Sequence, residues 1–166
     1  MGRLLRFLAD GHCYHVTTRT RDGVPVFQHP ADARIIVDAL QFLRRERAYL
    51  LAYAIMPDHL HAVFVPKNGY TISQVMQTVK GYTSRAINAR NKERGPLWQV
   101  SFYDRVIRDE AHLLDTLEYI QRNPVAAGLA DTPEGYLFSS AHPEAQTDLE
   151  MFLSGIAEAR KPRLRD

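Results

Sequence analysis

The sequence contains a single cysteine, Cys13, among its 166 residues. A disulfide bond within the chain is therefore impossible, and scarce cysteine is typical of proteins that fold in a reducing compartment. No stretch approaches the ~20 consecutive apolar residues that a membrane-spanning helix requires. The apolar run near the N-terminus is also too short for a secretion signal. We therefore expect a cytoplasmic protein that does not associate with membranes.

The sequence also lacks a strong overall charge, with a formal net charge of +2 at pH 7. Its hydrophobic content of 45% and charged content of 24% are those of an ordinary soluble globular protein. Positive charge is nevertheless uneven, because residues 80–108 contain seven basic and two acidic residues, a net charge of +5. Such a cluster is the usual footprint of a phosphate-backbone partner, although a solvated helix face is the commoner cause of a single charge run.

The chain is long enough for one domain with a substantial core. Four segments have the composition of strands: residues 12–20, 48–55, 60–65 and the second half of 98–107. Three segments carry apolar residues at helical spacing: residues 30–47, 71–91 and 110–122. A short amphipathic helix near residues 149–159 and a basic tail are predicted to follow.

The order of the main segments is β-α-β-β-α-β followed by another helix, which is the split βαβ or ferredoxin-like arrangement. We therefore predict an α+β fold built on a four-stranded antiparallel sheet with helices on one face. The other face of the sheet is expected to stay open for a site.

His59 and His61 follow a Met-Pro-Asp turn signal and lie two residues apart on a predicted strand. Side chains two apart share one face of a sheet, so the two imidazoles project together. Paired imidazoles are the beginning of a metal site. A His-x-His pair by itself, however, is more often two half-exposed strand histidines without a ligand.

Tyr119 and Asn123 lie four residues apart on the helix that follows the sheet, off its apolar stripe. Asp115 shares their face of the helix. A tyrosine that covers the edge of the core would also explain this placement. Asn123 precedes Pro124, and because a residue before proline is pushed out of the α region, we expect the helix to end there.

Six short segments recur in one known family: YHVT at residues 14–17, MPDHLH at 56–61, KGYT at 80–83, LWQ at 97–99, YDRVIRDE at 103–110 and EYIQRNPV at 118–125. Together they resemble the single-tyrosine HUH transposases of bacterial insertion sequences, and more closely the REP-associated tyrosine transposases. The resemblance covers about residues 11–142. It implies an N-terminal segment over residues 1–10, one catalytic domain over residues 11–142, and a C-terminal helix and basic tail over residues 143–166.

The resemblance implies that His59 and His61 hold a divalent metal, Mg²⁺ or Mn²⁺, with Asn123 as the third ligand. Tyr119 would be the nucleophile, four residues before that ligand. Its attack on a DNA phosphodiester would leave a 5′-phosphotyrosine and a free 3′-OH, and a second DNA end could reverse the step and join. Tyr103 is a rival nucleophile, but it lies on a predicted strand and has no partner at helical spacing. No general base is obvious beside Tyr119, although Asp115 is a possible helper.

The implied substrate is single-stranded DNA or a hairpin formed by a palindromic repeat, bound by a monomer or a homodimer. Four basic residues are candidates for DNA contacts, although a balance of local acids would also explain one or two of them: Lys80, Arg85, Arg105 and Arg108.

Two other functions fit parts of the pattern. A non-catalytic ferredoxin-like nucleic-acid-binding module would need aromatic residues on the open sheet face and would not use His59, His61 or Tyr119. A metal-dependent phosphodiester hydrolase would use a metal-bound water, and Tyr119 would then be structural. Only a strand transferase forms a covalent protein–DNA adduct.

Overall fold

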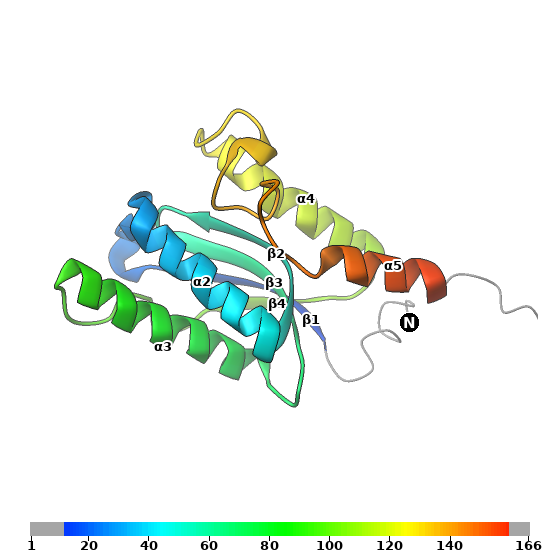
Figure 1. Cartoon of the computed structure of the whole chain (residues 1–166), viewed down its shortest axis with the longest axis horizontal. Coiled ribbons are helices and arrows are strands. Elements are labelled where there is room, and N and C mark those ends of the chain that lie inside the picture. Colours follow the sequence, from blue (N-terminus) through cyan, green and yellow to red (C-terminus); the bar gives the residue numbers. More distant parts are fainter. Residues whose placement is uncertain (1–11, 160–166) are drawn as a thin grey trace, which may run out of the picture.

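The computed structural model describes residues 12–159 and contains one four-stranded antiparallel sheet (Figure 1). Its strands are β1 (Cys13–Arg19), β2 (Ala48–Met56), β3 (His59–Pro66) and β4 (Tyr103–Ile107), in the spatial order β2-β3-β1-β4. The predicted α+β fold is therefore confirmed. Within these residues, no helix is long and apolar enough to cross a membrane.

Two long helices, α2 (Pro30–Glu46) and α3 (Ile72–Asn91), lie side by side on one face of the sheet, as predicted (Figure 1). A capping box starts α3: Thr71 Oγ1 accepts from Gln74 N at 3.2 Å, and Gln74 Oε1 accepts from Thr71 N at 2.9 Å. The helices and the sheet enclose the larger apolar core, which includes Ile36, Leu40, Leu50, Phe64, Met76 and Val79.

Two further helices, α4 (Glu110–Ala126) and α5 (Leu149–Ala159), pack against the opposite face. The expectation that this whole face stays open was therefore wrong. The apolar stripe of α4 needs a partner, and the alternating apolar residues of the sheet provide one. The resulting second core contains Leu51, Ala54, Val63, Ile107, Leu113, Leu117, Ile120, Phe152 and Ile156. Because the apolar stripe of α4 packs on the sheet, the residues off this stripe, such as Tyr119, remain outside the core.

The predicted end of α4 at Asn123 was also wrong, since the helix continues to Ala126 with Pro124 buried inside it. The stop lies one turn later, at a Schellman motif. There Gly128 adopts a φ of 73°, Leu129 N donates to Pro124 O at 2.9 Å, and Gly128 N donates to Val125 O at 3.0 Å. Burial of the proline ring and this C-terminal cap outweigh the local cost of helical backbone before a proline.

The segment after α4 shields the outer edge of β2, which would otherwise be free to pair with another strand. Ile55 N donates to Phe138 O at 2.9 Å, and Ser140 N donates to Tyr53 O at 2.8 Å. The Asp148 carboxylate then accepts from Leu50 N at 2.9 Å, which places the start of α5 against β2. The predicted N-terminal segment over residues 1–10 and the last residues of the basic tail lie outside the described part of the chain.

Candidate functional site

His59 and His61 lie on β3 and face α4, with their ring centroids 4.9 Å apart and their planes at 86°. The antiparallel register places Thr17 of β1 beside His61 and Arg19 beside His59. His61 is only 4% exposed, and the His59 side chain is 12% exposed. The period of two along β3 therefore brings both imidazoles to one face, as the spacing predicted.

One ring nitrogen of each histidine is already engaged. His59 Nδ1 lies 2.6 Å from Asp58 Oδ1, while His61 Nδ1 lies 3.0 Å from Thr17 Oγ1 and 3.2 Å from His15 Nε2. Neither Nε2 atom has a hydrogen-bond partner among the described residues. Metal-binding histidines commonly have this arrangement, in which a carboxylate or hydroxyl orients the ring and the other nitrogen binds the metal.

The buried position of His61 affects its protonation. Burial, reinforced by the positive charges of His59, His15 and Arg19, lowers the pKa of His61 to about 3. Burial, followed by Arg105 and His112, also lowers the pKa of His15. His61 is therefore neutral near pH 7, the form of imidazole that binds a metal.

Tyr119 projects from α4 toward His61 and His15, because it lies off the apolar stripe of α4 that packs on the sheet. Its ring centroid is 5.6 Å from that of His61 and 6.1 Å from that of His15. The side chain is 54% exposed, and its hydroxyl has no hydrogen-bond partner among the described residues. A phenol that is free and accessible beside buried imidazoles can meet a substrate group entering from solvent.

A cavity of about 560 Å³ joins these groups, and it is lined by His15, Thr17, His61, Tyr103, Arg105, His112, Asp115, Thr116 and Tyr119. Tyr103, the rival nucleophile, is therefore in the same cavity as Tyr119, and it begins β4 as the sequence suggested. His59 and Asn123 are not among the lining residues. Asn123 is half-buried one helical turn after Tyr119, and its side chain makes no hydrogen bond within residues 12–159.

The residues present fit a divalent cation by the chemistry of their donors. Two imidazole Nε2 atoms and one amide oxygen form a mixed nitrogen and oxygen set, and none is used within the described fold. No group of three His, Cys, Asp or Glu side chains in that part of the chain is arranged to hold a metal. A third protein ligand would therefore have to come from another residue type, such as the Asn123 amide.

The four predicted DNA-contact residues do not lie together. Arg105 lines the Tyr119 cavity and Arg108 is exposed just before α4, whereas Lys80 and Arg85 lie on α3, across the sheet. Lys80 Nζ donates to the carbonyl oxygens of residues 99, 100 and 101 at 2.6, 3.2 and 3.2 Å. Burial lowers the pKa of Lys80. The Lys80 ammonium therefore holds the loop of residues 99–101, and it would have to give up these hydrogen bonds to contact DNA.

The sequence did not predict that His15, Thr17 and Asp58 contact the two strand histidines, or that His112 lines the cavity. The period of two places His15 and Thr17 on one strand face, and the helical period places His112 two turns before Tyr119. Their side chains could thus be assigned to faces from sequence. Their proximity to His61 and Tyr119 depends on the β1–β3 register and on how α4 packs.

Comparison with known proteins places this chain in a family. Residues 9–123 match the family model described as Transposase IS200 like. A Haemophilus influenzae protein provisionally named a REP-associated tyrosine transposase is 26% identical over 109 residues, which are 60% of this chain and 62% of that protein. The REP-associated tyrosine transposase of Escherichia coli K12 is 24% identical over 102 residues, 60% of this chain and 59% of that protein.

The chain thus spans about three fifths of the length of these curated relatives. Among solved structures, a REP-associated tyrosine transposase bound to a REP hairpin has the same fold, with a TM-score of 0.68 at 19% identity. That match covers 94% of this chain and 87% of the other. Since the family model matches well over half of the sequence, the protein belongs to the IS200-like transposase family.

Proposed function

We propose that this protein cleaves and joins single-stranded DNA at hairpins through a covalent bond to Tyr119. The observation that carries the proposal is the accessible phenol of Tyr119, 5.6 Å ring to ring from the buried His61 and in one cavity with Arg105. A DNA phosphate in this cavity would meet a nucleophile, a metal-binding imidazole and a cation. The structural relative bound to a REP hairpin supports palindromic hairpin DNA as the substrate.

We assign His59, His61 and Asn123 as the ligands of a divalent metal, Mg²⁺ or Mn²⁺. When bound, the metal supplies charge neutralisation at the phosphate oxygens and orients the scissile group. Asp58 contacts His59 Nδ1, while Thr17 and His15 contact His61 Nδ1, so these residues would orient the two imidazoles and leave each Nε2 available to a metal.

In the proposed step, the phenol oxygen of Tyr119 forms a bond to phosphorus and the bond from phosphorus to the 3′ oxygen breaks. The DNA downstream remains attached as a 5′-phosphotyrosine. The leaving 3′ oxygen takes up a proton from solvent, so the DNA upstream ends in a 3′-OH. The phenol proton passes to solvent or to Asp115, which lines the same cavity. Because a phosphodiester bond replaces another, a second 3′-OH end can reverse the step and complete joining.

The test is a covalent-adduct assay with end-labelled hairpin DNA that carries single-stranded flanks. In the presence of Mg²⁺ or Mn²⁺, we expect a protein–DNA adduct that survives denaturation, together with a fragment ending in a 3′-OH. A hydrolase would give fragments without an adduct. A binding module would shift the DNA without cutting it, and either result would contradict the proposal.

The role of Asp58 leads to a prediction for metal affinity. Replacing Asp58 with asparagine removes the anionic acceptor 2.6 Å from His59 Nδ1 but keeps the shape of the side chain. Loss of such an orienting partner typically lowers metal affinity about 10- to 100-fold. Titration calorimetry with Mn²⁺ measures the change, with Asp22→Asn in the exposed β1–α2 turn as the control. An Asp58→Asn affinity equal to that of the control would show that Asp58 does not support the site.

The charges beside the cavity lead to a prediction for DNA binding. Arg105 and Arg108 are exposed and can contact phosphates, while Tyr103, 77% exposed, offers a surface for base stacking. For single strands, each lost phosphate contact reduces the slope of log affinity against log salt by about 0.7. We expect this change for Arg105→Gln, with a similar loss of affinity for every DNA sequence. Arg94→Gln, from the exposed loop after α3, is the charge-matched control. An unchanged slope in Arg105→Gln would exclude this contact.

A further inference from the structure

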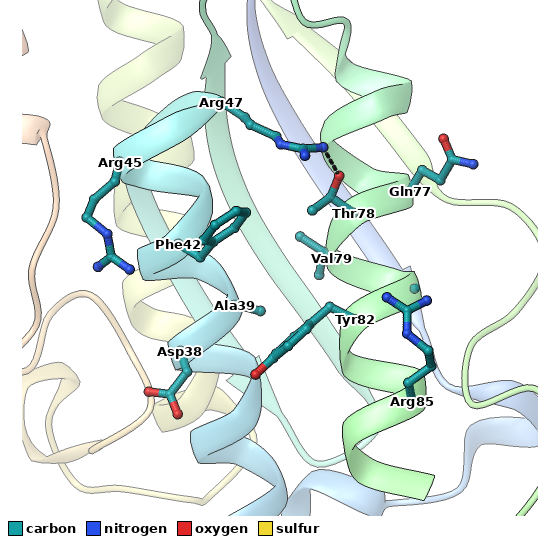
Figure 2. A pocket seen from close by; sticks show the side chains of 11 residues that line it. Asp38, Ala39, Phe42, Arg45, Arg47, Gln77, Thr78, Val79, Tyr82 and Arg85 are labelled. Carbon is teal, nitrogen blue, oxygen red and sulfur yellow. Dashed lines mark hydrogen bonds between the residues drawn. The ribbon is translucent and has the colours of Figure 1, made fainter. Parts of the chain in front are cut away.

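A groove of about 740 Å³ lies between α2 and α3 (Figure 2). These two helices cover one face of the sheet, and α4, which carries Tyr119, packs on the other. Buried Ala39 and Val79 lie at its base. Phe42 of α2 and Tyr82 of α3 project into it from opposite sides, as Figure 2 shows. The groove shares no lining residue with the Tyr119 cavity. Its role is therefore separate from the site described above.

The segment KGYT at residues 80–83 contributes to this groove. Two of its side chains have structural roles: Lys80 holds the loop after α3, and Thr83 Oγ1 accepts from Trp98 Nε1 at 2.9 Å in the core. Tyr82 has no such role. It is 49% exposed, and its hydroxyl has no hydrogen-bond partner among the described residues. Packing therefore does not explain a tyrosine at this position.

Phe42 is also left outside the core, with 43% of its surface exposed. The apolar face of α2 that packs on the sheet is complete without it, because Ile36, Leu40 and Leu43 are fully buried. The Arg47 guanidinium lies 6.0 Å from the centre of the Phe42 ring, so one side of that ring is already contacted. Two partly exposed aromatic rings thus flank one groove. Flat aromatic surfaces of this kind bind the bases of single-stranded nucleic acid without needing a particular sequence.

The charge of the groove favours an anion. It is lined by three arginines, Arg45, Arg47 and Arg85, and by one acid, Asp38. Arg47 is fixed in place, since it donates to Thr78 Oγ1 at 2.7 Å and lies 4.8 Å from the centre of the Tyr70 ring. Arg45 and Arg85 make no ion pair with any described residue. Two unpaired guanidinium groups therefore remain available to an incoming ligand.

We propose that the α2–α3 groove binds a single-stranded DNA segment, with bases stacked on Phe42 and Tyr82 and phosphates held by Arg45 and Arg85. Alternating aromatic and cationic contacts match a polymer that alternates flat bases and anionic phosphates. An acidic peptide would use the arginines but would gain little from two exposed rings. Since the sheet separates the groove from Tyr119, the segment bound here differs from the one that is cut.

Photocrosslinking with oligo(dT) that contains 5-iodouracil locates the bound strand. Trypsin releases Phe42 in the peptide of residues 35–44 and Tyr82 in the peptide of residues 81–85. We expect crosslinked DNA on both peptides, in addition to any on the cavity peptides of residues 95–105 and 109–122. Crosslinks confined to the cavity peptides would overturn the proposal.

Equilibrium binding of fluorescent oligo(dT) gives the second measurement. Tyr82→Ala and Phe42→Ala should each weaken binding about tenfold, the usual effect of losing one stacking platform. Arg45→Gln and Arg85→Gln should each lower the salt slope by about 0.7, and Arg94→Gln serves as the charge-matched control. Full affinity in all four groove variants would contradict the proposal, as would inhibition of oligo(dT) binding by poly-glutamate at equal charge concentration.

The two proposals fail separately. Covalent cleavage of a short hairpin should be unchanged in Phe42→Ala and Tyr82→Ala, because neither residue lies in the Tyr119 cavity. If no adduct forms with the wild-type protein but the groove variants lose oligo(dT) binding, the groove is supported and the catalytic proposal is wrong. If the adduct forms and the groove variants bind oligo(dT) normally, the catalytic proposal is supported and the groove proposal is wrong.

Discussion

Replacing Tyr119 with phenylalanine is expected to abolish the covalent DNA adduct while the protein still folds and binds hairpin DNA. The substitution removes only the oxygen that would attack phosphorus, and loss of a catalytic nucleophile lowers turnover by roughly 10⁴-fold or more. The hydroxyl has no hydrogen-bond partner among the described residues, and the side chain is 54% exposed. The free energy of unfolding should therefore change by no more than about 0.5 kcal/mol.

Tyr103→Phe is the matched control, because Tyr103 lines the same cavity and is even more exposed, at 77%. It should retain the adduct. If Tyr103→Phe were inactive and Tyr119→Phe active, the nucleophile would be on β4. The assignment of Asn123 as a ligand one turn after the nucleophile would then be wrong as well.

Removal of either strand histidine is expected to have the second large effect, the loss of divalent metal binding. His59→Ala and His61→Ala each delete a metal ligand. Loss of a residue that only orients a ligand lowers metal affinity by up to about 100-fold, so loss of the ligand itself should lower the affinity for Mn²⁺ by more than that. Asn123→Ala should weaken binding less, since two imidazoles remain. Titration calorimetry with Mn²⁺ measures all three variants.

Two controls guard this measurement against an unfolded variant. His61 is almost completely buried, so His61→Leu, which fills more of the space than alanine and carries no metal-binding atom, should keep the thermal midpoint closer to wild type and still lose the metal. His112→Ala removes an imidazole that lines the cavity but that we do not assign as a ligand. Mn²⁺ binding that survives in both His59→Ala and His61→Ala would contradict the proposed metal site.

Much of the fold could be predicted from the sequence, because the apolar spacing and capping residues of the strands and helices agree with how these elements pack. Aspartate favours the position before the first turn of a helix, and the carboxylate of Asp109, which precedes α4, accepts from His112 N at 2.8 Å. The end of α4 could not be predicted, because a sequence shows Pro124 as a stop but does not show that its ring is buried. The same limit applies to the second sheet face, where the packing of α4 and α5 decides how much remains accessible.

Sequence placed His59 and His61 on one face, since that follows from the period of two alone. It did not reveal that Thr17 and His15 contact His61, because residues 44 and 46 positions apart meet only through the register of β1 against β3. The clustering of basic residues along the sequence also suggested that the candidate DNA-contact residues lie on one surface, and they do not. Lys80 and Arg105 share one basic stretch of sequence, yet they lie on opposite sides of the sheet.

The central claim is that Tyr119 bonds to DNA, and peptide mapping of the adduct tests it most directly. Trypsin separates the two candidate nucleophiles, with Tyr103 in the peptide of residues 95–105 and Tyr119 in the peptide of residues 109–122, where it is the only tyrosine. After reaction with hairpin DNA and Mn²⁺ and digestion of the DNA by nuclease, mass spectrometry should find a 5′-nucleotide phosphate on Tyr119. A modified peptide 95–105, or cleaved DNA with neither peptide modified, would contradict the account.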